Sequence, residues 1–265
     1  MLMKMIANGK LNLSLYVTGV CGGMHLLDGV MHSVSPGDEL TAEESDRVRV
    51  TMLGAECPTE RNTAYRAAIL VRDRYGLSLD ISIAKHIPVG GGMGGSSADA
   101  AGVLACAERM LAGRGVNADL SDIAAAVGSD VSFMMRGGCA RVRGTGGDVT
   151  ALPPMEFDAL AIDCGAVDTA ACYRTFDELA LPFSSPTEGE LLSPFNALRP
   201  AAERLNGRLR DCAETAKRLG VAVSMTGSGG CMFVISPPAG TADAFREAGF
   251  RCFPVRSAAC GVVFV

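Results

Sequence analysis

Apolar side chains alternate with polar ones along several short stretches of the chain, which is the period of a half-buried strand. The clearest example is 79–84, where LDISIA alternates at every position. The stretch 6–17 alternates in part, through Leu11, Leu13 and Leu15. On this basis strands are predicted over 6–17, 48–53, 79–84, 139–143, 149–152, 160–163 and 232–235.

Other stretches carry apolar residues three and four positions apart, the period of an amphipathic helix. Asn62 precedes the first of them as a typical N-cap, and Gly76 follows it as a stop signal. Gly113, Gly128 and Gly220 follow three more stretches in the same way. Helices are therefore predicted from the cap Asn62 to Tyr75, and over 98–112, 120–127 and 201–219.

The best linker signal is Pro153-Pro154, which separates two regions of different pattern. The first region is rich in strands with inserted helices, and the second is a smaller α+β region. We predict an α+β protein of two lobes with a cleft between them, divided into domains at 1–152 and 153–265.

The composition narrows the functional classes. With 265 residues, 48% hydrophobic and 20% charged, the chain has the composition of a folded globular protein. Its net charge of -5 offers no general basis for binding nucleic acid or an anionic membrane, so an anion site must be built locally. Lys4 and Lys10 interrupt the first apolar stretch, and no run approaches the roughly 18 residues of a membrane span, which favours a cytoplasmic location.

The chain contains ten cysteines, but they form no C-x-x-C pair and accompany no histidine cluster. Zinc sites in proteins usually show close ligand spacing. We therefore expect the cysteines to remain reduced thiols that behave as small core residues.

The most informative stretch is PVGGGMGGSSAD, which begins at Pro88 between a predicted strand and a predicted helix. Free N–H groups and the helix dipole favour an anion at such a helix start, and glycines let the backbone approach it closely. An ordinary tight turn is the alternative, but five glycines in six positions followed by two serines disfavour it. The predicted phosphate-binding residues are Pro88, Val89, Gly90, Gly91, Gly92, Met93, Gly94, Gly95, Ser96, Ser97 and Ala98.

Two known loop patterns fit these glycines incompletely. Gly90, Gly92 and Gly95 satisfy G-x-G-x-x-G, but the acidic residue expected about 20 positions after a dinucleotide loop is missing. Gly90 and Gly95 also have Walker A spacing, with Ser96 where that motif has its lysine. A cation must then come from elsewhere, and Lys10 is the candidate.

Four motifs follow one another in a fixed order along the chain: Ala7-x-x-Lys10-x-Asn12, the glycine loop, Gly128-Ser129-Asp130-Val131 and Thr226-Gly227-Ser228-Gly229. In this order they resemble the GHMP kinases, the superfamily of galacto-, homoserine, mevalonate and phosphomevalonate kinases. The resemblance implies two lobes, an N-terminal domain like ribosomal S5 domain 2 and a ferredoxin-like C-terminal domain. It also implies ATP and Mg²⁺ as cofactors and a small-molecule alcohol as acceptor.

The resemblance assigns roles to single residues. Asp130 is implied to contact the acceptor hydroxyl, with Lys10 supporting Asp130 and the migrating phosphoryl group. Asn62 and Lys85 match positions near the nucleotide base, although Asn62 is equally well explained as an N-cap and Lys85 as a solvated strand end. Ser97 is a candidate Mg²⁺ ligand. The substrate-side candidates are Asn12, Met24, His25, Thr169, Asn196, Thr226 and Gly227.

Within the superfamily the chain is most similar to the branch that phosphorylates a cytidyl derivative of methylerythritol for isoprenoid synthesis. That branch has a tyrosine that stacks on cytosine, where this chain has Met24 beside His25. An acceptor of the homoserine or mevalonate type remains an alternative, as does a catalytically silent ligand-binding protein. The presence of both Lys10 and Asp130 argues against a silent protein, because a pure binder does not need the pair.

Overall fold

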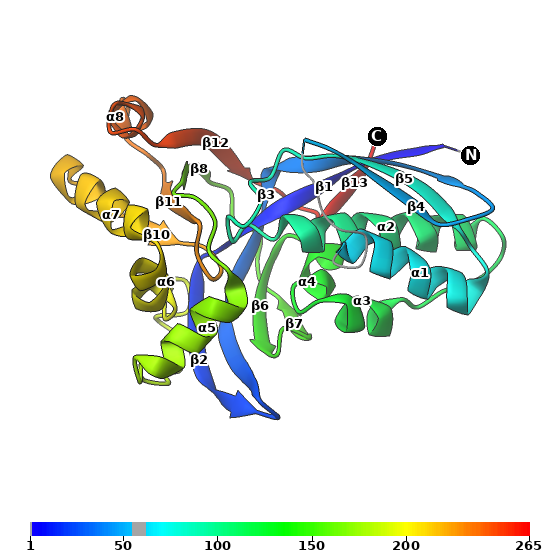
Figure 1. Cartoon of the computed structure of the whole chain (residues 1–265), viewed down its shortest axis with the longest axis horizontal. Helices are drawn as coiled ribbons and strands as arrows, with labels where there is room; N and C mark the ends of the chain where they lie inside the picture. Colours follow the sequence, from blue (N-terminus) through cyan, green and yellow to red (C-terminus); the bar gives the residue numbers. More distant parts are fainter. Residues whose placement is uncertain (1, 55–61) are drawn as a thin grey trace.

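The computed structural model describes residues 2–54 and 62–265, so Cys57 lies outside the described residues. Strands and helices are mixed along the whole chain (Figure 1). The strands are β1 (Met3–Asn12), β2 (Ser14–Cys21), β3 (Met24–Glu44), β4 (Arg49–Leu53), β5 (Leu79–Ala84), β6 (Cys139–Gly144), β7 (Asp148–Ala151), β8 (Asp158–Asp163), β9 (Phe195–Asn196), β10 (Ser224–Met225), β11 (Cys231–Ile235), β12 (Arg251–Ser257) and β13 (Val262–Phe264). The helices are α1 (Thr63–Tyr75), α2 (Gly95–Ala112), α3 (Ser121–Val127), α4 (Val131–Arg136), α5 (Thr169–Glu178), α6 (Arg199–Leu205), α7 (Gly207–Leu219) and α8 (Thr241–Glu247).

The long strand β3 is the spine of the sheet. It spans 21 residues and pairs in turn with β1, β2, β5, β6 and β12. The main path through the sheet has the order β10-β11-β8-β12-β3-β1-β13. Strands from the two halves of the chain therefore meet through β3, as Figure 1 shows.

Helices α1 to α4 cover the N-terminal part of the sheet, at the right of Figure 1. Helix α2 is central to this layer, because it packs against α1, α3, α4, β1 and β3. Its buried face consists largely of small residues such as Ala100, Ala101 and Gly102. A Cβ on Gly102 would lie 2.8 Å from a methyl carbon of Leu40, so the helix approaches β3 more closely than a larger residue allows. The middle of α2 therefore packs closely against β3.

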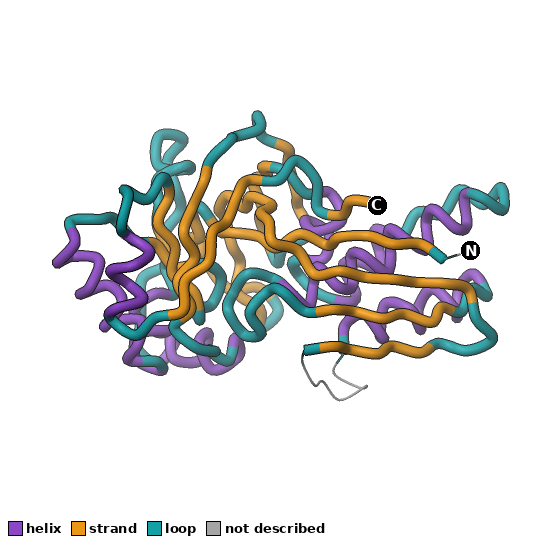
Figure 2. The backbone as a smooth tube through the Cα atoms, turned by 90° about the horizontal axis from the view of Figure 1, so that it is seen from above, coloured by secondary structure: helices purple, strands orange, loops and turns teal. Residues whose placement is uncertain are grey.

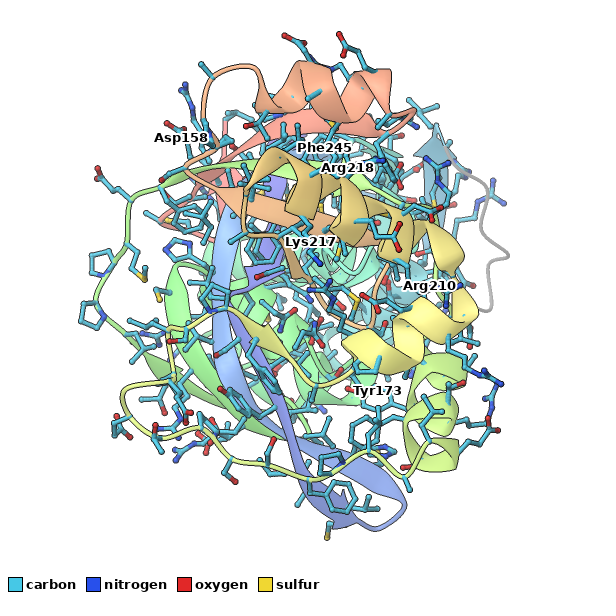
Figure 3. All side chains as sticks on the ribbon, turned by 90° about the vertical axis from the view of Figure 1, so that its left-hand side faces the viewer. Asp158, Tyr173, Arg210, Lys217, Arg218 and Phe245 are labelled. Atoms are coloured by element: carbon cyan, nitrogen blue, oxygen red, sulfur yellow. The ribbon has the colours of Figure 1, made fainter. Side chains whose placement is uncertain are left out.

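A second core lies between β8, β10, β11 and helices α5 to α8. It is built around Phe176, Met232 and Phe245, and Leu15 and Val17 of β2 join it. Figure 2 shows the two groups of helices at opposite ends of the strands. Figure 3 looks onto the second group, with Phe245 labelled. These features agree with the predicted fold class, and the domain boundary at 152/153 stays a prediction.

The structure confirms most of the predicted strands and corrects one. The stretch 6–17 forms two strands, β1 and β2, because the chain bends at Leu13. At this bend the backbone oxygen of Ser14 would lie 2.2 Å from a Cβ on Gly29, so only glycine fits opposite it. No part of β3 was predicted from the sequence, and its Pro36 and Gly37 are typical turn residues. The strand continues past them because the register of β1 and β3 shifts between Asn8 and Gly9.

The predicted helices are confirmed with two corrections. The stretch 201–219 is not one helix, because Asn206 is extended (φ -135°, ψ 103°) and separates α6 from α7. Its side chain accepts from the Arg208 N–H and donates to the Cys164 carbonyl, so the asparagine caps α7 and anchors it. Helix α2 begins at Gly95, earlier than Ala98, because Gly94 supplies a left-handed cap.

The fold also shows where the cysteines lie and whether a helix could span a membrane. The described cysteines are free thiols. Most of them, such as Cys106, Cys172 and Cys212, are buried in the core as predicted, but the prediction is wrong for Cys21 and Cys260, which are exposed. Among the described residues, we find no helix with both the length and the apolar character of a membrane span.

Candidate active site

A cavity of about 500 Å³ opens between the glycine loop and the start of α5. The predicted residues that line it are Lys10, Asn12, Lys85, Pro88, Val89, Gly90, Gly91, Gly92, Gly94, Gly95, Ser96, Ser97, Asp130, Thr169 and Gly227. Seven other predicted residues do not line it: Met24, His25, Asn62, Met93, Ala98, Asn196 and Thr226. Most of the predicted site is thus gathered around one cavity.

The glycine loop has the backbone that an anion site needs. Gly90, Gly92 and Gly94 have φ of 70°, 73° and 74°, a left-handed conformation that other residues rarely adopt. Gly94 precedes α2 without a side-chain capping bond, so the first N–H groups of the helix have no partner within it. Ser96 and Ser97 add hydroxyls at the same cavity wall. The positive end of the α2 helix dipole therefore points into the cavity, which favours the binding of a phosphate there.

Met93 and Ala98 were predicted to bind the nucleotide, and their side chains do not face the cavity. Each is only 1% exposed and packs in the main core. The backbone of Met93 still has a role, because its carbonyl accepts from the Lys10 N–H at 2.9 Å. The loop is thereby bonded to β1.

A second glycine turn, 226–230, packs directly on the first. A Cβ on Gly92 would lie 2.2 Å from the Thr226 carbonyl oxygen, so the two turns touch through their backbones. Asn12 joins the turn to β1: its Oδ1 accepts from the Gly227 N–H at 2.9 Å, and its own N–H donates to Thr226 Oγ1 at 3.1 Å. Asn196 donates to the Met225 and Gly227 carbonyls, both at 2.9 Å. Through these hydrogen bonds Asn12, Asn196 and Thr226 hold the second glycine turn in place.

The side chains of Lys10 and Asp130 lie close to each other at the wall of the cavity. Lys10 Nζ lies 3.7 Å from Asp130 Oδ2 and donates to Asn12 Oδ1 at 2.5 Å. The Lys10 side chain is 2% exposed, and burial lowers its pKa while the Asp130 carboxylate opposes that shift. Asp130 precedes α4 but makes no side-chain capping bond, and it stays 25% exposed toward the cavity. A carboxylate held this way can accept a proton from, or orient, a hydroxyl in the cavity.

The predicted cytidine-side residues lie on the β2–β3 hairpin. Met24 is exposed near its tip, and His25 stacks on Tyr173 of α5 with ring centroids 4.7 Å apart. His25 Nε2 lies 2.8 Å from Asp177 Oδ1. Figure 3 shows α5, which carries the labelled Tyr173, beside this hairpin. Tyr173 itself lines the cavity, so it connects the hairpin with the phosphate end of the site.

Thr169 lies one turn before Tyr173 on α5 and also lines the cavity. Its hydroxyl forms a 2.8 Å hydrogen bond with Ser228 Oγ, which belongs to the second glycine turn. Burial raises the pKa of Tyr173, and the Asp130 carboxylate raises it further. Tyr173 therefore stays protonated and presents a neutral hydroxyl.

The two residues predicted near the nucleotide base have other partners. Asn62 caps α1, since its Oδ1 accepts from the Tyr65 N–H at 3.1 Å, which confirms the N-cap interpretation. Lys85 is not a solvated strand end: its side chain is 5% exposed and its ammonium contacts Asp38 and Asp99. Burial raises the pKa of Asp99 to about 7, against the opposing effect of Lys85.

The predicted site residues did not include Asp38, Asp99, Tyr173 and Ser228. The sequence could have indicated Asp99, because an acidic residue in the first turns of an otherwise apolar helix needs a partner. The partner of Asp38 lies 47 residues away, so no local pattern indicates it. Ser228, whose partner Thr169 lies 59 residues away, does stand within the Thr226-Gly227-Ser228-Gly229 motif.

Comparisons with known proteins place this architecture in one class. The family models for the GHMP kinases N-terminal domain and the GHMP kinases C-terminal domain match residues 62–140 and 187–254. A homoserine kinase structure from Cytophaga hutchinsonii, 18% identical, superposes with a TM-score of 0.71 over 100% of this chain and 97% of its own, which shows a shared fold. The protein thus has the two-domain fold of the GHMP kinases, which are ATP-dependent small-molecule kinases.

Closer relatives define the branch. The 4-diphosphocytidyl-2-C-methyl-D-erythritol kinase of Streptomyces avermitilis is 35% identical over 90% of this chain and 89% of its own. The enzyme of the same name from Cutibacterium acnes is 33% identical over 88% and 86%. A crystal structure of 4-(cytidine 5'-diphospho)-2C-methyl-D-erythritol kinase is 28% identical, with a TM-score of 0.79 over 97% and 99%. The chain belongs to the 4-diphosphocytidyl-2-C-methyl-D-erythritol kinase family, which confirms the resemblance seen in its motifs.

Proposed function

We propose that this protein transfers the γ-phosphate of ATP to the 2-hydroxyl of 4-diphosphocytidyl-2-C-methyl-D-erythritol. The observation that carries the proposal is the Lys10–Asp130 pair, which shares one cavity with the N-terminus of α2. Family membership supports the acceptor. A silent ligand-binding protein has no need for a buried lysine held beside a cavity-facing carboxylate.

Phosphoryl transfer depends mainly on positioning and charge compensation. In the proposed site, the first N–H groups of α2 and the loop backbone hold the phosphates. Asp130 orients the acceptor hydroxyl and takes its proton. Lys10 lies within reach of Asp130, and its positive charge offsets negative charge that develops on the transferred group.

Mg²⁺ fits the donor set of this cavity. Magnesium in kinases is usually held by one or two protein oxygens together with phosphates and water. Ser97 Oγ lies 3.9 Å from the position of a Cβ on Gly128, so it faces the segment that carries Asp130. We assign Ser97 as the protein ligand, and the ion would neutralise phosphate charge there.

The acceptor's cytidine is assigned to the β2–β3 hairpin, beyond the cavity. His25 is the hydrogen-bonding candidate for the base edge, and its stack on Tyr173 fixes the orientation of its ring. Met24 offers an apolar but non-aromatic surface. The exposed aromatic side chain of Phe183 stacks on Phe176, with ring centroids 6.1 Å apart, and Phe176 in turn contacts His25 edge-on.

A coupled ADP-release assay tests the proposal with three acceptors. We expect turnover with 4-diphosphocytidyl-2-C-methyl-D-erythritol and none above background with homoserine or mevalonate. Turnover of homoserine or mevalonate alone would contradict the assigned acceptor and leave the kinase class intact. Failure with every acceptor, together with measurable ATP binding, would favour the silent protein.

Met24→Tyr is expected to lower KM for the cytidyl acceptor by about five- to tenfold, since stacking on a base contributes roughly 1–3 kcal/mol. Because Met24 near the hairpin tip does not line the phosphate cavity, kcat should change by less than about twofold. Met24→Leu is the matched control: it keeps an apolar side chain without a π-face and should leave KM unchanged. Equal effects of tyrosine and leucine would show that stacking plays no part.

A further inference from the structure

Lys85 occupies an unusual environment for a lysine. Its side chain is 5% exposed, and its ammonium contacts two buried carboxylates, Asp38 at 0% and Asp99 at 5% side-chain exposure. The hydrogen bond to Asp99 Oδ2 is 2.7 Å long. Burying three charged groups costs free energy, and an apolar cluster of the same volume would serve a core as well or better. A purely stabilising role therefore explains this cluster poorly.

The cluster joins the two ends of the glycine loop. On the entering side, Asp38 Oδ1 accepts from the His86 and Ile87 N–H groups at 2.6 and 2.9 Å, directly before Pro88. On the leaving side, Asp99 lies one turn after Gly95 on α2. Lys85 bridges the two carboxylates, so one ammonium ion links the strand that enters the loop with the helix that leaves it.

The contacts above the cluster are close. A Cβ on Gly95 would lie 3.3 Å from Lys85 Nζ and 3.2 Å from the Ile87 side chain. The first residue of α2 thus rests on the ammonium group and on the residue that precedes the loop. A displacement of Lys85 would move the N–H groups that face the cavity.

We propose that Lys85 is a positioning residue that clamps both ends of the glycine loop and so presents the N-terminus of α2 to the nucleotide phosphates. The inference rests on the proposed nucleotide site, and it replaces a contact between Lys85 and the base. The two roles differ in what they affect. A clamp governs phosphate binding whatever the base, whereas a base contact governs the preference for adenine.

Lys85→Met separates these roles. We expect ATP and ADP to bind about tenfold more weakly or worse, because small misplacements of binding groups have large effects. The inhibition constant of adenosine, measured in competition with ATP, and the ratio of ATP to GTP affinity should both stay within about twofold of wild type. Weaker adenosine binding or a changed ATP to GTP ratio would overturn the clamp in favour of a base contact.

Lys85→Met leaves two carboxylates without their cation, so variants at Asp99 guard against a failure to fold. Asp99→Leu keeps the Lys85–Asp38 pair and removes only the link to α2, whereas Asp99→Asn keeps an acceptor oxygen for Lys85. Asp99→Leu should weaken ATP by about tenfold, and Asp99→Asn should restore most of that loss. Equal ATP affinity in the two variants would contradict the proposal.

Ile81→Ala provides the control for stability, since Ile81 is buried in β5 and does not line the cavity. It should lower the melting temperature without changing ATP affinity. If Ile81→Ala weakens ATP as much as Lys85→Met at equal loss of stability, the cluster is only structural. If wild type itself binds no ATP, the proposed function fails, whereas unchanged ATP affinity in Lys85→Met and Asp99→Leu defeats the clamp alone.

Discussion

Asp130→Asn is expected to lower kcat by about 10²- to 10⁴-fold, the range that a general base contributes, while ATP affinity stays within about twofold. Asparagine has the shape of aspartate but cannot take a proton from the acceptor. The Asp130 side chain makes no capping hydrogen bond to α4, so its replacement by asparagine does not remove a helix cap. The glycine loop, which is the proposed nucleotide site, keeps its hydrogen bonds to β1 and to the turn 226–230.

Single-turnover transfer and calorimetric ATP binding, measured on the same preparation, check this expectation. Asp122→Asn is the matched control, because Asp122 pairs with Arg74 on the exposed surface of α3 and does not line the cavity. It should leave kcat unchanged. An Asp130→Asn protein that retains near wild-type kcat would remove Asp130 from the mechanism, and one that lost ATP binding would make it a nucleotide ligand instead.

Gly94→Val is expected to weaken ATP binding by more than about tenfold and to reduce kcat as well. Gly94 has φ 74°, and its Cβ would lie 2.3 Å from the Met134 methyl carbon and 3.1 Å from Lys10 Cγ. The valine therefore strains the loop and at the same time pushes on Lys10, the proposed catalytic lysine. The free energy of unfolding should fall by about 1–3 kcal/mol, which chemical denaturation can measure.

The control for this substitution is Gly115→Val. Gly115 has nearly the same φ, 77°, but a Cβ there meets nothing within 4 Å among the described residues. It carries the backbone strain without the collision, so it should lower stability and leave ATP affinity unchanged. If both variants bound ATP equally well, the collision of a side chain at position 94 with Met134 and Lys10 would be irrelevant to the nucleotide.

The sequence alone determined the features that depend on neighbouring residues. Helix α1 was predictable from its Asn62 cap, its apolar period and its Gly76 stop, and strand β5 from strict alternation. The glycine loop was predictable because positive φ and close backbone approach restrict the residue type. The order of the motifs was enough to recognise the family, since each motif is local.

Only the tertiary structure decided the features that depend on distant partners. The path of β3 through Pro36 and Gly37 depends on a register shift in its pairing with β1, where Asn8 pairs with Gly37 and Gly9 with Val34. The structural role of Asn12 depends on its hydrogen bond to Gly227, in a turn 215 residues away. Lys85 reads locally as an exposed strand end, yet folding places its ammonium between Asp38 and Asp99. A buried charge requires a partner that compensates it. The packed fold decides which residue that partner is, because the partner can lie at any distance along the chain.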